Sequence, residues 1–247
     1  MSDSDLAVVV PAFDEEARIA ATVKAASSIE GVDLVVVVDD GSRDQTRRIA
    51  QEAGAVVVRH SRNRGKAAAM ETGAEAVAAI EDREGRAQPR LLLFLDADLE
   101  SSAGNAGPLA GPVRSGAAGM TIATLPPQKL AGGGHGFVVR LARDGIRGAV
   151  GFECRQPLSG QRCLSREAFE AARPLAYGFG VETGLTIDVL RAGIPVQEVE
   201  VEIHHRVTGS DLASQLHRAK QYRDVALALG MRKVPAALRP RTWRRPQ

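Results

Sequence analysis

Residues 34–46 read Leu-Val-Val-Val-Val-Asp-Asp-Gly-Ser-Arg-Asp-Gln-Thr, passing from an unbroken aliphatic run to an acidic turn and then to a helical pattern. An aliphatic run this short is typical of a strand that is covered on both faces. Similar runs occur at residues 6–10, 55–58 and 91–95. The first part of the chain therefore repeats strand, loop and helix.

Helical patterns rich in Ala, Glu, Arg and Lys separate these runs at residues 15–28, 44–53 and 65–80. Ser42 is predicted to cap the second helix, and Gly54 lies where that helix would end. Strands and helices that alternate in this way are joined by right-handed crossovers in a mostly parallel sheet. The sequence therefore predicts an α/β fold with helices on both faces of the sheet.

After Asp98 the pattern is less regular. Residues 101–115 are rich in Gly, Ala and Pro and are assigned no element, and residues 125–136 are predicted to form a loop. The elements expected beyond Asp98 are strands at 117–124 and 195–203, and helices at 137–146, 166–172 after a Ser165 cap, 181–192, and 211–229 after a Ser210 cap. No linker divides this region from the first half, so we expect a single domain over residues 1–230.

The composition limits the class of protein. With 247 residues, of which 44% are hydrophobic and 25% charged, the chain can bury a sizeable core and is not disordered as a whole. Its apolar runs are far shorter than the roughly 20 residues that span a bilayer, and its N-terminus lacks the basic start of an export signal. Two cysteines are too few for a disulfide framework. We therefore expect a cytoplasmic protein.

The charge is unevenly distributed. Six of the 32 basic residues lie from Met231 onward, where there is no acidic residue, so the rest of the chain carries 26 basic against 30 acidic residues. An acidic body gives no electrostatic reason to expect nucleic-acid binding. Residues 231–247 are predicted to be a basic, flexible tail, which could contact an anionic membrane surface.

Acidic residues follow three of the predicted strands, at residues 11–16, 39–44 and 96–98. In an open α/β sheet, ligands bind beyond the carboxyl ends of the strands. Carboxylates that meet there would repel one another unless a cation or hydrogen-bond donors neutralised them. This edge of the sheet is therefore the predicted site.

Asp96 and Asp98 form an Asp-x-Asp pattern. On an extended backbone, residues two apart point to the same side, so both carboxylates would face one ligand. Such hard oxygen donors suit Mg²⁺ or Mn²⁺, and a metal there could hold a diphosphate and stabilise its charge as it leaves. The alternative is a solvated acidic turn.

Residues 39–42 allow two interpretations as well. They form either a tight turn with a helix cap or a site where Asp39 or Asp40 accepts the imide N–H of a uracil base. Lys66 follows a basic stretch and could contact phosphate. Neither P-loop spacing nor a Gly-x-Gly-x-x-Gly pattern is present. His60, His135 and His217 are predicted to be polar surface residues.

Four blocks, at residues 8–16, 38–46, 63–66 and 95–98, resemble family-2 glycosyltransferases of the GT-A fold. They occur in that family's order and spacing, although Asp14 replaces the usual Asn. The resemblance implies a nucleotide-diphospho-sugar transferase fold and a nucleotide-binding half at residues 1–100. The donor contacts that it implies are Pro11, Ala12, Phe13, Glu15, Asp39, Asp40, Gly41, Ser42, Lys66, Asp96 and Ala97.

Blocks in the second half, at residues 132–134, 155–160, 177–185 and 205–206, resemble glucosyl-3-phosphoglycerate synthases. The resemblance implies an acceptor-binding half at residues 101–230, with acceptor contacts from Gly133, Gly134, Arg155 and Ser159. It also implies that His205, with His204 as the competing residue, joins Asp98 on the metal. His135 and Gly136 stand where that family has Arg-Val-Thr.

The reaction implied is metal-dependent transfer of a sugar, expected to be glucose, from a UDP-sugar to a hydroxyl or to a small phosphate-bearing acceptor such as a phosphoglycerate-like molecule. Asp98 and Glu182 are the expected catalytic residues. Glu182 would be the general base of an inverting enzyme, or would orient the acceptor or sugar in a retaining one.

Other interpretations stay open. A nucleotidyltransferase would need a Gly-rich phosphate loop with Arg and Lys after the first strand, which residues 11–16 lack. A relative that binds a nucleotide sugar without turnover and a homodimer are both compatible with the sequence. A polyprenyl-phosphate acceptor is also compatible, because Arg218, Lys220 and Arg223 precede the basic tail.

Overall fold

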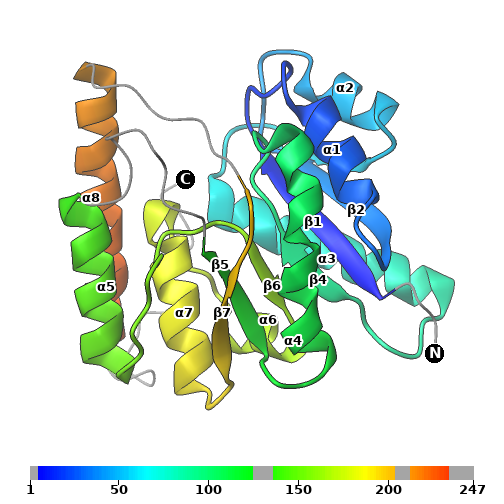
Figure 1. Ribbon diagram of the computed structural model, residues 1–247. Coiled ribbons are helices and arrows are strands. Elements are labelled where there is room, and N and C mark those ends of the chain that lie inside the picture. Colours follow the sequence, from blue (N-terminus) through cyan, green and yellow to red (C-terminus); the bar gives the residue numbers. More distant parts are fainter. Residues whose placement is uncertain (1–4, 125–135, 204–211, 234–247) are drawn as a thin grey trace.

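The computed structural model describes residues 5–124, 136–203 and 212–233. A central sheet runs through this part of the chain, with its strands in the order β3-β2-β1-β4-β6-β5-β7. Helices lie on both sides of it (Figure 1). The strands are β1 (Leu6–Ala12), β2 (Val32–Asp39), β3 (Val56–Arg59), β4 (Leu91–Phe94), β5 (Met120–Thr124), β6 (Arg162–Leu164) and β7 (Val196–Glu200).

The helices occupy most of the connections between the strands. Gly54 has a φ of 101° directly after the second helix, as expected for a glycine that ends a helix. The helical elements are α1 (Ile19–Ser27), α2 (Thr46–Glu52), α3 (Lys66–Glu84), η1 (Glu100–Leu109), α4 (Ala110–Arg114), α5 (Phe137–Val150), α6 (Arg166–Ala171), η2 (Gly178–Gly180), α7 (Val181–Arg191) and α8 (Leu212–Lys233).

The predicted parallel sheet is confirmed, with one exception. Strand β1 pairs in parallel with β2 and β4, and β5 pairs in parallel with β7. Strand β6 is antiparallel to both of its neighbours. Strand β6 was not predicted, because three residues that begin with an arginine give no strand pattern.

The core has one layer on each face of the sheet. Val8 belongs to the layer that includes Ile19 of α1, together with residues of η1 and α4. Val9 belongs to the layer that includes Met70 of α3, together with residues of α6 and α7. Successive side chains of a strand point to opposite faces, so a strand covered on both faces needs an unbroken aliphatic run.

Helices α5 and α8 lie side by side at one end of the molecule (Figure 1). Val138 and Ala142 of α5 pack with Val225 of α8 in a small apolar cluster. Arg232 near the end of α8 is buried and pairs with Asp188 of α7. Residues 231–233, assigned to the tail from the sequence, therefore belong to α8, and the rest of that segment lies outside the described residues.

Two further expectations are corrected. Residues 101–115, which were assigned no element, form most of η1 and α4. Ser42 does not cap α2, because the N-cap of that helix is Gln45. Ser165 does cap α6, accepting a hydrogen bond from the Ala168 N–H at 3.1 Å. The predicted Ser210 cap lies outside the described residues.

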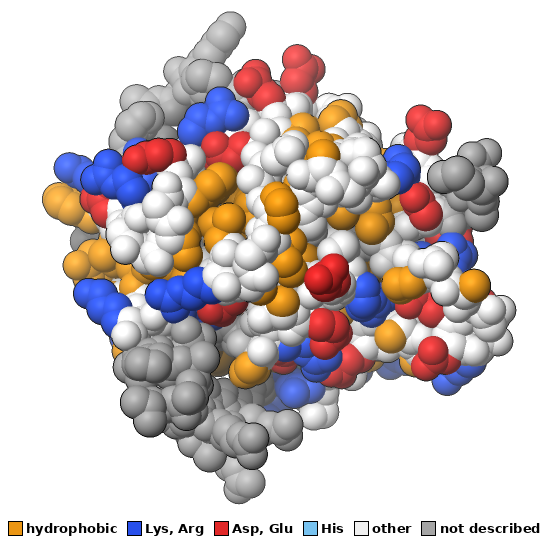
Figure 2. Space-filling model, turned by 90° about the horizontal axis from the view of Figure 1, so that it is seen from below, with side chains coloured by type: hydrophobic (Ala, Val, Ile, Leu, Met, Phe, Trp, Pro, Cys, Tyr) orange, Lys and Arg blue, Asp and Glu red, His pale blue; other side chains and the backbone are white. Residues whose placement is uncertain are grey.

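The described surface is mixed in charge. On the face in Figure 2, Lys and Arg side chains are interspersed with Asp and Glu, so the described part of this face has no extended area of one sign. Among the residues that the structure describes, no helix is long and apolar enough to cross a membrane.

Candidate active site

The Asp96–Asp98 turn is held in place by the first helix. Strand β4 ends at Phe94, and the turn follows two residues later. The buried Thr22 hydroxyl of α1 donates to the Ala97 carbonyl and accepts from the Glu100 N–H, both at 2.8 Å. The extended backbone expected for Asp96–Asp98 is therefore wrong, since Ala97 and Asp98 lie in a turn.

Asp96 is the centre of a polar network. Its Oδ1 accepts from Lys66 Nζ at 2.6 Å, and its Oδ2 accepts from the Gln161 side chain at 2.7 Å. Lys66 Nζ also lies 2.9 Å from Glu182 Oε1. One lysine thus joins two carboxylates that are 86 positions apart in the sequence, and both belong to the predicted site.

The lysine remains protonated in this network. Burial by itself would lower the pKa of Lys66, but the charges of Asp96 and Glu182 and their hydrogen bonds raise the pKa above its ordinary value. The Lys66 side chain is still 29% exposed, so it can exchange these partners for another anion. Lys66 is the first residue of α3, after Gly65 with a φ of 86°.

Glu182 lies in the first turn of α7 and is buried. The N-terminus of a helix carries a partial positive charge that stabilises a carboxylate there. The charge of Lys66 acts on the same group at 2.9 Å. Glu182 is therefore a buried carboxylate that reaches the pocket through its pairing with Lys66.

Because Gly160 has no side chain, the Lys66–Asp96 pair can occupy the space next to it. A Cβ at this position would lie 2.5 Å from Lys66 Nζ and 2.6 Å from Asp96 Oδ2. Both distances are far below ordinary van der Waals contact. The pair can therefore form as it does because residue 160 has no side chain.

Asp40 organises the loop before α3. Its Oδ1 lies 2.6 Å from His60 Nδ1 and accepts from the Arg64 N–H at 2.7 Å, and its Oδ2 accepts from the Gly65 N–H at 2.6 Å. His60 also lies 2.9 Å from the Thr72 hydroxyl and is buried. The prediction that His60 is a surface residue is therefore wrong.

The turns after β1 and β2 interlock through backbone N–H groups. The Asp14 N–H donates to Ser42 Oγ at 3.0 Å, and the Arg43 N–H donates back to Asp14 Oδ1 at 2.8 Å. Three more such bonds join the turns: Glu15 N to Thr46 Oγ1, Glu16 N to Asp44 Oδ2, and Gln45 N to Glu16 Oε2. Backbone hydrogen-bond donors therefore stabilise the carboxylates of Asp14, Glu16 and Asp44.

Gly41 allows these turns to approach the next loop. Its φ is 79°, and a Cβ there would lie 2.6 Å from the Arg62 carbonyl carbon. A neighbouring backbone cannot move aside as a side chain can. Gly41 thus has a backbone role in this turn.

A pocket of about 180 Å³ opens beside this network. It collects six of the predicted donor residues: Pro11, Ala12, Phe13, Asp40, Lys66 and Asp96. Asn63, Gly65 and Ala69, which were not predicted as contacts, complete its lining. The pocket lies at the carboxyl ends of β1, β2 and β4, as expected for a ligand site in an open α/β sheet.

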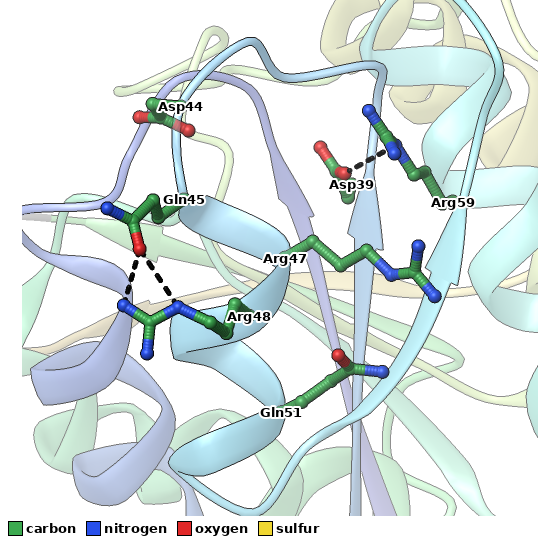
Figure 3. Close-up of a pocket in the computed structure, with 7 residues that line it drawn as sticks. All are labelled: Asp39, Asp44, Gln45, Arg47, Arg48, Gln51 and Arg59. Carbon is green, nitrogen blue, oxygen red and sulfur yellow. Dashed lines mark hydrogen bonds and ion pairs between the residues drawn. The ribbon is translucent and has the colours of Figure 1, made fainter.

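Asp39 lies apart from this pocket. It lines a second hollow of about 340 Å³ between α2 and β3, together with Asp44, Gln45, Arg47, Arg48, Gln51 and Arg59 (Figure 3). Its Oδ2 is 3.3 Å from Arg59 Nε, and its Oδ1 accepts from the Ser42 N–H. Neighbouring residues of a strand point to opposite faces, so Asp39 and Asp40 line different hollows.

The predicted acceptor residues are only partly described. Arg155 pairs with Glu198 at 3.0 Å, and its side chain is 63% exposed. Ser159 is buried and donates to the Gln161 side chain at 3.3 Å. Gly133 and Gly134 lie outside the described residues.

The predicted metal ligands are also incompletely described. Asp98 is partly buried near Glu15, whose pKa is raised mainly by burial and also by the charge of Asp98, against the lowering effect of Arg18. His204 and His205 lie outside the described residues. Within those residues, no group of three or more His, Cys, Asp or Glu side chains could hold a metal ion. Both cysteines are free and buried.

Sequence reasoning missed two residues that build the site, Gln161 and Arg162. Gln161 contacts Asp96, and the buried Arg162 donates to the Glu182 carbonyl at 2.9 Å. Both follow Gly160, the last residue of the block at 155–160 that resembles glucosyl-3-phosphoglycerate synthases. Their place next to that block was the only signal in the sequence. Neither a glutamine nor an arginine indicates by its type that its partner lies 20 or more positions away in the chain.

The fold and this pocket together define the GT-A class of nucleotide-diphospho-sugar transferase folds. The model of glycosyl transferase family 2 matches residues 7–134, just over half of the chain. The chain belongs to glycosyl transferase family 2.

Two relatives match beyond the first half of the chain. Glycosyltransferase AglJ of Haloferax volcanii is 31% identical in an alignment 214 residues long, which covers 83% of this chain and 64% of that protein. Glucosyl-3-phosphoglycerate synthase of Mycolicibacterium paratuberculosis is 30% identical in an alignment 209 residues long, which covers 74% of this chain and 59% of that protein. The chain thus spans about three fifths of the length of these relatives.

Solved structures give the same assignment. Glucosyl-3-phosphoglycerate synthase from Mycobacterium tuberculosis, in complex with Mn²⁺, UDP and glucosyl-3-phosphoglycerate, aligns with a TM-score of 0.73 and 28% identity. The alignment covers 96% of this chain and 82% of that one. Another structure of that enzyme contains Mn²⁺, UDP-glucose and phosphoglyceric acid, and aligns with a TM-score of 0.72.

Proposed function

We propose that this protein is a metal-dependent glycosyltransferase that moves glucose from UDP-glucose to a small phosphate-bearing acceptor. The observation that carries the proposal is Lys66, a partly exposed cation that joins Asp96 to Glu182 and lines the donor pocket. A protonated lysine in this position meets the requirement for binding a diphosphate. The similarity to glucosyl-3-phosphoglycerate synthase supports the choice of donor and acceptor.

The uridine would lie in the pocket lined by residues 11–13. Of the two candidates for the uracil contact, Asp40 is preferred over Asp39, because Asp40 lines this pocket and Asp39 lines the hollow beside α2. Asp40 already accepts two backbone N–H groups and lies 2.6 Å from His60 Nδ1, but a carboxylate can accept about four hydrogen bonds, which leaves room for about one more. Asp96 would then bind the ribose.

The donor chemistry of the site fits a divalent cation. Asp98 is partly exposed in the turn that follows the pocket-lining Asp96, and Mg²⁺ and Mn²⁺ prefer hard carboxylate oxygens of this kind. Asp98 and His205 would hold the ion, with His204 as the alternative. When bound, the ion would withdraw negative charge from the diphosphate of the donor.

Glu182 and Lys66 would act on the reacting groups. In the reaction, the bond between the anomeric carbon and the UDP oxygen breaks, and the acceptor oxygen bonds to that carbon. Lys66 would contact the departing diphosphate. Glu182 would accept the proton of the acceptor hydroxyl if the configuration inverts. If the configuration is retained, Glu182 would orient the acceptor or sugar, and the proton would pass to an oxygen of the departing diphosphate.

The remaining expectations form part of the same proposal. The donor would be held by residues 1–100, and the acceptor by residues 101–230, including Gly133, Gly134, Arg155 and Ser159. The reaction would take place in the cytoplasm. The network between Asp96 and Glu182 supports this division, because it joins one residue from each half.

The test is a screen of UDP-, GDP- and ADP-sugars against pools of phosphorylated and unphosphorylated acceptors, with Mg²⁺, Mn²⁺ or chelator. We expect UDP release only when UDP-glucose, a divalent ion and a phosphate-bearing acceptor are all present. Asp98→Ala should abolish this release, whereas Asp82→Ala, at an exposed position of α3, should not change it. Full activity in chelator would contradict the metal dependence.

The acceptor class needs its own control. Co-sedimentation with anionic liposomes and transfer to polyprenyl phosphate would instead support a lipid acceptor. Product analysis by NMR would show whether the anomeric configuration inverts or is retained. Tight binding of UDP-glucose without turnover in any pool would contradict the proposed enzyme and indicate a binding protein.

A further inference from the structure

Arg162 is a buried cation without a carboxylate partner. It is fully buried in β6, and no carboxylate of the described residues forms an ion pair with it. Burying a charge that is not paired is costly, and burial lowers the pKa of this guanidinium. A buried group that carries such a cost is therefore expected to have a structural role, through the segments that its hydrogen bonds join.

The guanidinium holds two segments of the site. Its Nε donates to the Ser159 carbonyl at 2.9 Å, and a terminal nitrogen donates to the Pro157 carbonyl at 3.1 Å. The other terminal nitrogen donates to the Glu182 carbonyl at 2.9 Å and to the Thr186 hydroxyl at 2.8 Å. Arg162 thus ties the loop at residues 157–161 to the first turns of α7.

These contacts close a ring around the reacting groups. Gln161, next to Arg162 in the chain, donates to Asp96 at 2.7 Å. Asp96 pairs with Lys66, and Lys66 pairs with Glu182. The ring returns through the backbone of Glu182 to Arg162. The separation between the Glu182 and Asp96 carboxylates therefore depends on the guanidinium.

We propose that Arg162 is a positioning residue for the sugar transfer, fixing Glu182 and Gln161 on either side of the Lys66–Asp96 pair. The inference rests on the proposed function, because it assigns Glu182 a role in transfer. Arg162 lines neither of the two hollows described above, so it would act only through the residues that it holds.

The shape of the arginine side chain explains why position 162 is an arginine and not a lysine. A guanidinium presents five N–H groups in a rigid planar fork, and four of them are used here in bonds to two segments. A lysine has the charge but no fork, so it cannot reach acceptors on both segments at once. We therefore expect Arg162→Lys to retain little more of the activity than Arg162→Met does.

The experiment compares Arg162→Lys and Arg162→Met with Arg90→Met. Arg90 is buried too, but it pairs with Asp33 and Glu84 and precedes β4, at the opposite end of that strand from Asp96. We expect kcat to fall about 100-fold in both Arg162 variants, the cost of a displacement of about 1 Å, with KM for UDP-glucose changed less than about threefold. Arg90→Met should lower the melting temperature and leave kcat at 25 °C unchanged.

Thr186→Val is the milder variant, since it keeps the charge and three of the four Arg162 hydrogen bonds, and it removes besides the fourth only the bond that the Thr186 hydroxyl donates to the Glu182 carbonyl at 2.9 Å. It should fold and lose about tenfold in kcat, as expected from a bond of this kind. Hydrogen exchange should show loss of protection at residues 157–161 and 182–186 in the Arg162 variants and not in Arg90→Met. This readout needs no turnover.

The inference is overturned if folded Arg162→Met keeps its kcat, if Thr186→Val is fully active, or if protection at both segments is unchanged. It is also overturned if Arg90→Met loses kcat to the same degree, because a general loss of stability would then explain both. Failure of the proposed function is a separate result: the wild-type protein would transfer no sugar, whatever the exchange pattern of the variants.

Discussion

The substitution Gly160→Ala should change the geometry of the site while changing the stability of the fold very little. The added Cβ would lie 2.5 Å from Lys66 Nζ and 2.6 Å from Asp96 Oδ2. Ordinary contact begins near 3.5 Å, so both charged groups must move by about 1 Å. They are ends of side chains rather than backbone, and their pair is partly exposed, so moving them should cost less than about 1 kcal/mol of folding free energy.

The same displacement should be far more costly for transfer. A misplacement of about 1 Å reduces the rate about 100-fold, which corresponds to about 2.7 kcal/mol of transition-state stabilisation. The assay measures UDP release at saturating UDP-glucose and acceptor, together with UDP affinity by calorimetry and the melting temperature. We expect a large fall in kcat with a melting temperature lowered by at most about 4 °C.

Gly148→Ala is the matched control. Gly148 is exposed in α5, and a Cβ there would meet no atom within 4 Å. The same substitution should leave kcat unchanged and stabilise the protein by about 0.5–1 kcal/mol, since alanine favours a helix over glycine. The reasoning is refuted if Gly160→Ala keeps its kcat within about twofold, or if its activity falls only as its folded fraction falls.

Three further predictions follow from the described contacts. Glu182→Gln should lower kcat by about 10²–10⁴-fold with UDP affinity nearly unchanged in calorimetry, and unchanged turnover would remove this residue from the reaction. Burial acts to raise the pKa of Asp44, but hydrogen bonds, chiefly from Thr46, lower it overall. Its charge therefore stabilises the fold above its ordinary pKa, and this stability is lost as pH falls through the lowered value. Urea unfolding should show that Asp44→Asn costs about 1 kcal/mol at pH 7 and less at pH 3, and an equal cost at both would contradict this. Burial raises the pKa of Cys154 and of Cys163 to about 12, so neither thiol should react with Ellman's reagent at pH 8 until the protein is denatured.

The sequence alone predicted the elements whose signal is local. The aliphatic runs predicted β1 to β4, because a buried parallel strand shows its burial in its own residues. The Asp-x-Asp pattern and Lys66 located the site for a similar reason, since the carboxyl ends of parallel strands meet at one edge of the sheet. The resemblance to family-2 glycosyltransferases then gave the chemistry expected there.

Other features depended on contacts between distant segments. Strand β6 has no strand pattern, and Arg162 in it is buried only because carbonyls of residues 157, 159 and 182 surround its guanidinium. The side on which Asp39 and Asp40 lie depends on how β2 is placed in the sheet. For the carboxylates of the interlocked turns, the sequence left open whether a cation or hydrogen-bond donors would meet them, and the structure places backbone N–H groups of the opposite turn against Asp14 and Asp44.

The difference between the features that the sequence predicted and those that it did not has one physical cause. Periodicity, turn residues and helix caps act over a few positions, so the chain itself carries them. An ion pair such as Lys66 with Glu182, or a space such as that above Gly160, exists only where the topology brings separate segments within a few ångströms. The sequence therefore determined the framework and the kinds of residue at its edge, and only the tertiary structure decided which of those residues meet.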